Sequence, residues 1–341
     1  MSFIKRRGRL LCILLLLVLL PVILPNPARI GMFISCGVAS VLCIGWLLIL
    51  RIGCLSLGQV AFLAIGGYTS AILCQKFGVA PWLGLLFGGA VAGLIALGIG
   101  LVFLRIRGLY LSIITFAFAE IVRLVVSTVE FFGGHGGILE IPKYPSITLP
   151  FMGKVDFDSP FSCYYIMLAV LLIGGGFMWR MDHSALGRTF RSLPQNEDLA
   201  QSLGIYPLKY KVISFTSACF FAGMAGAFTA HYYGCLYPGS YTAMQSVIVQ
   251  IQATVGGAAS VAFGGLLGGF LMVMIETLLL NVDARWVLIF YGAVIIFITF
   301  VLPEGLLSLP RELLKWRKNA EATTDQEESL EPSAKGDVLS E

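Results

Sequence analysis

The chain has 341 residues, of which 57% are apolar and only 12% are charged, and its mean hydropathy is +0.88. This composition excludes an ordinary soluble domain and indicates a polytopic membrane protein. The net charge of +4 does not indicate nucleic-acid binding, because Lys and Arg occur in short clusters between apolar runs, as the positive-inside rule requires. The eight cysteines form no C-x-x-C pair and lie mostly in apolar runs, which favours packing over metal or redox roles.

A helix needs about 20 mostly apolar residues to cross a bilayer. We therefore predict an all-α integral membrane protein, a bundle of about ten segments that includes glycine-broken or re-entrant ones. The predicted segments lie near residues 10–25, 30–50, 56–75, 82–104, 109–130, 161–179, 212–233, 243–258, 264–281 and 286–302. The third and eighth are short and rich in glycine. The first follows a basic N-terminus like that of a signal peptide, but no small-x-small cleavage site follows it, so we expect it to be retained.

The basic residues also predict the orientation of the segments. If residues 1–9 are cytoplasmic and the segments alternate, 17 of the 23 Lys and Arg residues face the cytoplasm and five face the exterior. Both termini are then cytoplasmic, in the cell inner membrane. The transmembrane domain spans residues 10–302, with a long external loop at 131–160 and a cytoplasmic segment at 180–211. The tail, 303–341, is cytoplasmic and has few apolar residues, so we expect disorder beyond about residue 318.

Hydrogen-bonding side chains lie along the third segment, which Gly58, Gly66 and Gly67 are expected to interrupt. They are Ser56, Gln59, Tyr68 and Thr69, and a later stretch at 255–269 is similarly interrupted by glycine. Paired interrupted segments in the two halves of a transporter often flank the substrate path, because loosened backbone is tolerated where it lines a cavity. We interpret these residues as candidates for a translocation path, with a purely structural use as the alternative.

Three ionisable residues lie within predicted spans, where charge is expensive. Glu120 and Arg123 are three residues apart on one helix face and can neutralise each other, which favours an internal ion pair over direct substrate contact. Glu276 has no cation nearby in the sequence. We expect it to face a polar interior or a partner subunit, or to be protonated.

The longest internal polar run is Ala185–Lys211. Ser192 and Gln195 have the spacing of a capping box, Glu197 follows near the positive end of the helix dipole, and Gly204 is placed to close a short helix. A capped helix between two spans, on the side where basic residues collect, is suited to a partner that pushes on it from the cytoplasm.

Several motifs of soluble enzymes are absent from the sequence. There is no G-x-x-x-x-G-K-[ST] phosphate loop, no nucleophile elbow and no H-E-x-x-H. We therefore predict a chain that is not an enzyme, does not hydrolyse ATP itself and needs no cofactor.

Several long motifs, in order, resemble the branched-chain amino acid ABC importer permeases, specifically the LivM-type subunit. The resemblance extends from about Gly53 to Leu307. It includes LSLGQVAFLAIGGYTSAIL, LRIRGLYLSIITFAFAEIVRLV, GRTFRSLPQNEDLAQSLGIYPLKYK, SACFFAGMAGAFTAHYYG, VGGAASVAFGGLLGG and YGAVIIFITFVLPEGL. The GGHGG of the external loop departs from a family pattern closer to TGG-x-x-G, and so does the region around Asp198 and Leu199.

The resemblance implies a permease that forms a heterodimer with a shorter permease in the lipid bilayer, above two ATPase subunits. An external binding protein would deliver branched-chain, hydrophobic amino acids. By this analogy the cytoplasmic segment couples the permease to an ATPase. The coupling residues would be Arg188, Arg191, Asn196, Glu197, Ala200, Leu203 and Gly204.

Two other functions remain open on the sequence alone. Relatives of the same fold are associated with urea, short amides or other small carboxylates, and the spans do not separate these cargoes. An ion-coupled secondary transporter using Glu120 and Glu276 is a further alternative, although it has no need for the capped cytoplasmic segment.

Overall fold

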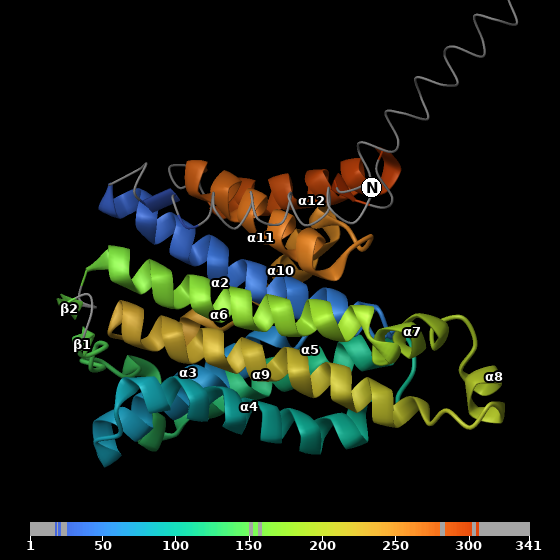
Figure 1. Cartoon of the computed structure of the whole chain (residues 1–341), viewed down its shortest axis with the longest axis horizontal. Helices are drawn as coiled ribbons and strands as arrows, with labels where there is room; N and C mark the ends of the chain where they lie inside the picture. Colours follow the sequence, from blue (N-terminus) through green and yellow to red (C-terminus); the bar gives the residue numbers. More distant parts are fainter. Residues whose placement is uncertain are drawn as a thin grey trace, which may run out of the picture.

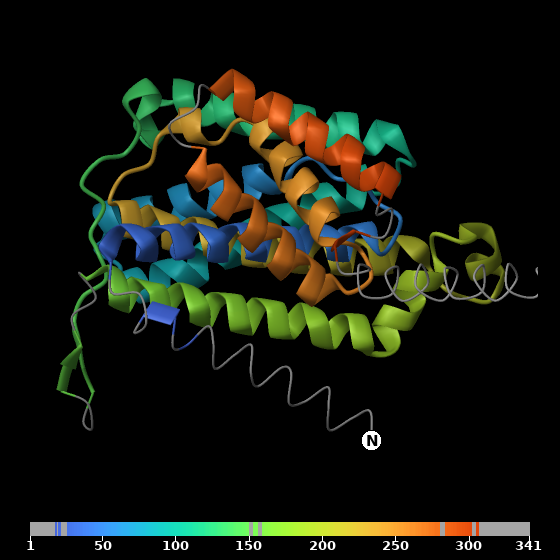
Figure 2. The same cartoon turned by 90° about the horizontal axis from the view of Figure 1, so that it is seen from above.

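The computed structural model describes residues 18, 20–21, 26–149, 153–155, 159–279, 284–301 and 305–306. Most of its helices run roughly along one axis and pack as a bundle (Figures 1 and 2). Seven helices in the described residues are long and apolar enough to cross a membrane. They are α2 (Pro27–Leu50), α3 (Gln59–Phe77), α4 (Pro81–Phe103), α5 (Leu109–Thr128), α6 (Pro160–His183), α9 (Pro207–Tyr233) and α11 (Val261–Leu278). The predicted all-α, polytopic membrane class is confirmed.

The remaining elements are shorter or connect the long helices. They are η1 (Glu130–Phe132), η2 (Gly134–Gly136), β1 (Ile147–Leu149), β2 (Gly153–Val155), α7 (Ala185–Ser192), α8 (Glu197–Ser202), η3 (Pro238–Ser240), α10 (Ala243–Gly256) and α12 (Ala284–Val301). Strands β1 and β2 form an antiparallel hairpin within the loop predicted to be external. The predicted segment 10–25, apart from residues 18 and 20–21, the N-terminal residues 1–9 and the tail beyond 306 lie outside the described residues.

Proline and small polar residues mark where several helices begin. Proline occupies the first position of α2, α4, α6 and α9, where its missing N–H removes no helical hydrogen bond. The side chain of Asn26 caps α2 by accepting from the Ala28 N–H at 3.1 Å. Helix α9 ends at Gly234, whose φ of +70° is a conformation that glycine adopts readily.

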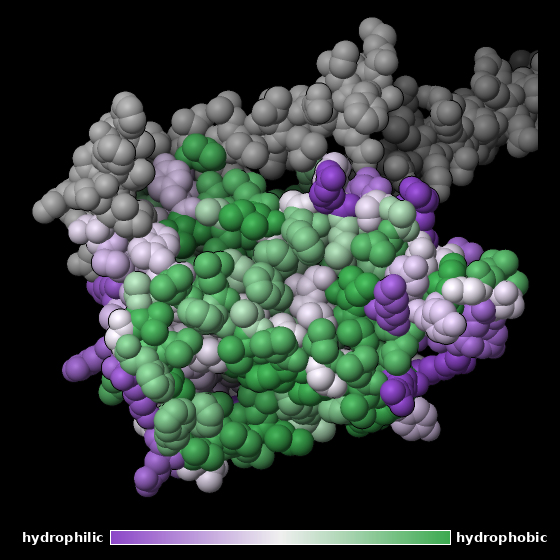
Figure 3. Space-filling view, turned by 60° about the horizontal axis from the view of Figure 1, so that its bottom comes forward, coloured by the Kyte–Doolittle hydropathy of each residue, from purple (hydrophilic) through white to green (hydrophobic). Residues whose placement is uncertain are grey.

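The core of the bundle is formed by α2, α3 and α9, the helices with the largest buried share among the candidate spans. Helix α9 packs against both α3 and α4 because glycines let the backbones approach. A Cβ added at Gly66 of α3 would overlap the carbonyl oxygen of Gly223 on α9. Helices α4 and α5 bury the least of the first four spans, and exposed apolar side chains form a broad surface between polar ends (Figure 3).

The third predicted segment is not interrupted at Gly66 and Gly67, contrary to the prediction. Helix α3 continues from Gln59 to Phe77, and both glycines are contact points with α9. The non-helical backbone lies before the helix, at residues 54–58. Glycine within a helix is therefore used here for close packing, which the sequence pattern could not distinguish from a break.

The eighth predicted segment is short and ends at a glycine break. Helix α10 has 14 residues, which corresponds to about 21 Å and is less than the hydrocarbon thickness of a bilayer. Gly257 follows with a φ of +99°, and α11 starts at Val261. The interruption predicted within residues 255–269 is present at this connection.

Connections predicted to share one side of the membrane lie at the same end of the bundle. At one end, Arg51 Nη2 donates to the carbonyl oxygen of Ala259 at 3.0 Å, which joins the end of α2 to the α10–α11 connection. At the other end, Lys76 Nζ donates to the carbonyl oxygen of Phe131 at 3.2 Å. Helices α7 and α8 project beyond the first of these ends (Figure 1).

Candidate functional site

The polar segment between α6 and α9 contains two short helices rather than the one predicted. Residues 180–211, to which the family resemblance assigns coupling, are called the coupling segment below. Helix α7 is capped by Ser184, whose Oγ accepts from the Leu186 N–H at 3.2 Å. Helix α8 is capped by Asn196, whose Oδ1 accepts from the Leu199 N–H at 3.0 Å. Both helices therefore begin with local hydrogen bonds that satisfy free N–H groups.

The predicted capping box at Ser192 and Gln195 is wrong. Ser192 is the last residue of α7, and its Oγ donates to the carbonyl oxygen of Thr189 at 2.9 Å. Helix α7 occupies the position at which the prediction placed an extended cap, so the cap of the second helix moves to Asn196. The interpretation as a capping box was wrong because the sequence analysis did not recognise the preceding helix α7.

Gly204 closes α8, as predicted. Its φ is +81°, its N–H donates to the carbonyl oxygen of Gln201 at 2.9 Å, and the Ile205 N–H donates to that of Ala200 at 3.0 Å. These two bonds are the pair found in a Schellman motif, which satisfies the last carbonyl groups of a helix. The chain then turns directly into α9.

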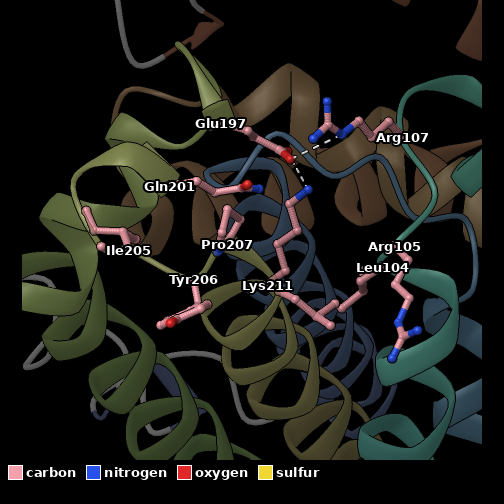
Figure 4. A pocket seen from close by; sticks show the side chains of 11 residues that line it. Leu104, Arg105, Arg107, Glu197, Gln201, Ile205, Tyr206, Pro207 and Lys211 are labelled. Carbon is pink, nitrogen blue, oxygen red and sulfur yellow. Dashed lines mark hydrogen bonds and ion pairs between the residues drawn. The ribbon is translucent and has the colours of Figure 1, made fainter. Parts of the chain in front are cut away.

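Glu197 joins three parts of the molecule at this end of the bundle (Figure 4). One carboxylate oxygen is bonded to Lys211 Nζ of α9, and the other lies 3.4 Å from Arg107 Nε in the α4–α5 connection. Lys211 is only 4% exposed, so this pair is largely shielded from water. Arg107 Nη2 also lies 3.6 Å from Asp198 Oδ1. These ion pairs therefore link α8 to α9 and to the connection between α4 and α5.

A small cavity adjoins this ionic cluster. It encloses about 450 Å³ between the start of α9 and the α4–α5 connection. Its lining, drawn in Figure 4, combines charged and apolar side chains: Leu104, Arg105, Arg107, Glu197, Gln201, Gly204, Ile205, Tyr206, Pro207, Leu208 and Lys211.

Asp182, near the C-terminal end of α6, is a buried carboxylate that the sequence analysis did not select. Its side chain is 2% exposed, and Oδ1 lies 3.2 Å from Arg191 Nη2 and 3.7 Å from Arg51 Nε. Arg191 Nη2 also donates to the carbonyl oxygen of Asp182 at 2.8 Å. Burial lowers the pKa of Arg51, and the charge of Asp182 opposes that shift. The sequence signal that could have identified Asp182 is its position as an acidic residue at the basic end of a predicted span.

The predicted coupling residues divide into exposed and supporting ones. Arg188, Asn196, Leu203 and Gly204 are exposed, whereas Ala200 is the buried residue of α8. Arg191 and Glu197 are engaged in the ion pairs described above. Leu203 is 74% exposed, and its neighbours Leu199 and Tyr206 are also exposed, which gives the tip of the segment an apolar surface.

The predicted polar residues of the third segment are packed between helices. Ser56, Gln59 and Tyr68 are each at most 2% exposed, and Thr69 is half-buried. The carbonyl oxygen of Ser56 accepts from Trp46 Nε1 at 3.0 Å. These contacts support helix packing, and none of these four side chains lines the cavities described here.

Glu120 and Arg123 form the ion pair expected from their spacing. Arg123 Nε donates to Glu120 Oε1 at 2.8 Å, on the weakly buried helix α5.

Glu276 is the one predicted path residue among the described residues that lines a large cavity. Its Oε2 accepts from the Tyr291 hydroxyl of α12 at 3.1 Å. The cavity encloses about 900 Å³ and is bounded by α2, α3, α9, α10 and α11. Among the described residues, no group of three or more His, Cys, Asp or Glu side chains could hold a metal ion.

Comparison with known proteins gives the family of the chain. Residues 29–299 match the model of the branched-chain amino acid transport system / permease component family. The chain is 31% identical over 286 residues to the high-affinity branched-chain amino acid transport system permease protein LivM of Escherichia coli K12, covering 79% of this chain and 67% of that protein. The LivM protein of Salmonella typhimurium LT2 is also 31% identical, over 80% of this chain and 68% of that protein. No solved structure gave a significant match. The chain therefore belongs to the permease components of branched-chain amino acid transport systems.

Proposed function

We propose that the chain is one permease subunit of an ATP-driven importer and forms half of a translocation path for branched-chain amino acids. It pairs with a second, shorter permease, and two separate ATPase subunits hydrolyse ATP. A binding protein delivers the cargo from outside. The complex lies in the cell inner membrane with both termini of this chain in the cytoplasm. Family membership, from the family model and the two LivM relatives, supports this proposal.

The coupling segment is the observation that carries the proposal. It projects from the bundle (Figure 1). The side chains of Leu199, Leu203 and Tyr206 within it are exposed. Exposed apolar side chains of this kind, on a capped and ion-paired support, suit a protein partner better than water. We assign the direct ATPase contact to the exposed residues, Arg188, Asn196, Leu203 and Gly204.

The supporting residues transmit the movement. Closure of the ATPase pair displaces α8, and Glu197 passes the displacement to α9 through Lys211 and to the α4–α5 connection through Arg107. Arg191 holds α7 on the end of α6 through Asp182, while Ala200 is the buried residue of α8. The permease halves then change the side to which the path opens.

Two substitutions test the coupling role. Glu197→Lys places a third positive charge beside Lys211 and Arg107, and Gly204→Val forces a branched side chain into a left-handed backbone conformation. Both are expected to lower cargo uptake and cargo-stimulated ATPase activity in the reconstituted complex at least about tenfold, a loss of about 1.4 kcal/mol of coupling. Membrane insertion should be unchanged.

Glu130→Lys provides the matched control, because Glu130 lies in the exposed element η1 and away from the coupling segment. It should transport like the unmodified chain. Normal uptake and ATPase activity in both Glu197→Lys and Gly204→Val would contradict the coupling assignment. Uptake by the purified chain alone in liposomes, without ATP or partners, would instead support an ion-coupled carrier.

A further inference from the structure

The large cavity beside Glu276 has an uneven distribution of charge. Of its lining residues, all of which the structure describes, Glu276 is the one that carries a formal charge, and no Lys, Arg or His is among them. A carboxylate within a membrane protein is expensive unless a cation or several hydrogen-bond donors face it. The cavity therefore has an acceptor for a positive charge and no fixed partner for a negative one.

A hydrogen bond from the neighbouring helix α12 orients the Glu276 carboxylate. The Tyr291 hydroxyl donates to Oε2 at 3.1 Å. Gln252 lines the same cavity. Gln252 is itself held by Cys43, whose Sγ lies 3.8 Å from Oε1 of the amide. Hydrogen bonds of this kind keep a carboxylate in a fixed position and leave its other oxygen able to bind a ligand.

The rest of the lining can accommodate an apolar side chain and a second polar group. Met32, Leu42 and Val273 form part of an apolar wall, and Gln245 and Tyr241 bring amide and hydroxyl groups to the same cavity. Its volume, about 900 Å³, is within the range of small-molecule sites.

We infer that this cavity binds the cargo inside the membrane and that Glu276 is the residue that receives the cargo's ammonium group. The inference rests on the proposed importer function and adds a cargo-contacting residue to it. An ammonium group would form charge-assisted hydrogen bonds with the carboxylate. A simple carboxylate would be repelled, and urea or a short amide would leave the charge of Glu276 unpaired. The charge distribution thus favours cargo that carries an amine over the other cargoes of this fold.

Cys235 provides a reporter within the native chain. It lines the same cavity, and it is exposed, whereas the other cysteines that the structure describes are buried. Occupation of the cavity should therefore slow its reaction with N-ethylmaleimide. The rate is measured by mass spectrometry on the assembled transporter in nanodiscs, without the external binding protein.

Three probes that share the branched side chain of leucine distinguish the effect of the ammonium group from that of the carboxylate. They are L-leucine, 3-methylbutylamine, which lacks the carboxylate, and 4-methylpentanoate, which lacks the amine. The first two should protect Cys235 and the third should not. Glu276→Gln should raise the half-protecting concentration of 3-methylbutylamine by about tenfold or more. Glu276→Asp should retain protection, and Glu130→Gln, the same change in the exposed element η1, should behave as the unmodified chain.

Equal protection by 4-methylpentanoate and 3-methylbutylamine would overturn the inference, as would protection that Glu276→Gln leaves unchanged. If the Gln variant does not assemble, the three probes on the unmodified chain decide the question. ATP-driven uptake of L-leucine is measured in parallel. Uptake without amine-specific protection overturns this inference alone, whereas amine-specific protection without uptake overturns the proposed importer function alone.

Discussion

Replacement of Asp182 by Asn tests how α7 is attached to the bundle. The substitution keeps the shape of the side chain and removes the charge that faces Arg191 and Arg51. Loss of one partner of a buried ion pair costs about 3–5 kcal/mol. The arginine side chains are, however, 47% and 22% exposed and can turn toward water, so we expect about 1–3 kcal/mol.

The loss should be concentrated in α7, because Arg191 belongs to that helix. Its bond of 2.8 Å to the backbone carbonyl oxygen of residue 182 is not altered by the substitution. Since each 1.4 kcal/mol is a factor of ten, amide exchange in residues 185–192 should become about 5- to 150-fold faster. Hydrogen exchange measured by mass spectrometry, on the chain in nanodiscs, reports this region directly.

Asp198→Asn is the matched control, because the Asp198 side chain is 84% exposed and lies 3.6 Å from Arg107. An exposed pair of this kind contributes little, so exchange in α7 should be unchanged. Unaltered exchange in Asp182→Asn, or equal acceleration in both variants, would refute the view that Asp182 anchors α7.

Two further changes test packing inside the bundle. Gly66→Ala should lower the free energy of unfolding of the purified chain by about 1–3 kcal/mol, measured as a lower thermal midpoint. The new Cβ overlaps the Gly223 carbonyl oxygen and forces α3 and α9 apart. His231→Ala should accelerate amide exchange in residues 138–144, because it removes two hydrogen bonds of 2.7 Å. In one, Nδ1 donates to the Pro142 carbonyl oxygen, and the other joins Nε2 and the Ser70 hydroxyl.

Each of these changes has a control of the same kind. Gly98→Ala lies on α4 with nothing within 4 Å of the added Cβ, and it should leave the thermal midpoint unchanged. His135→Ala alters an exposed residue of η2 and should leave exchange in residues 138–144 at its original rate. A midpoint for Gly66→Ala equal to that of Gly98→Ala would show that α3 and α9 can separate at no cost. Equal exchange in the two histidine variants would show that His231 does not hold the loop.

Local sequence signals were sufficient for features formed by neighbouring residues. The long helices coincide with apolar runs because a backbone in lipid must satisfy its hydrogen bonds within the segment. Gly204 closes α8 because the left-handed conformation is needed at that single position. Glu120 and Arg123 pair because residues three apart share a helix face.

Predictions from local sequence failed where one sequence pattern is compatible with two different structures. Gly66 and Gly67 are compatible with a broken helix and with a close helix contact, and only the position of α9 decides between them. Ser192 and Gln195 have the spacing of a capping box, but α7 occupies the position of the cap.

The sequence by itself determined the membrane class, the positions of most spans, the family, and the polar segment between α6 and α9. The tertiary structure decided which charges meet. Arg51 and Arg191 are far apart in the chain and converge on Asp182, and Glu197 reaches both Lys211 and Arg107. The physical reason is that hydropathy acts along a single helix, whereas an ion pair or a cavity depends on the relative positions of several helices, which their side-chain packing sets.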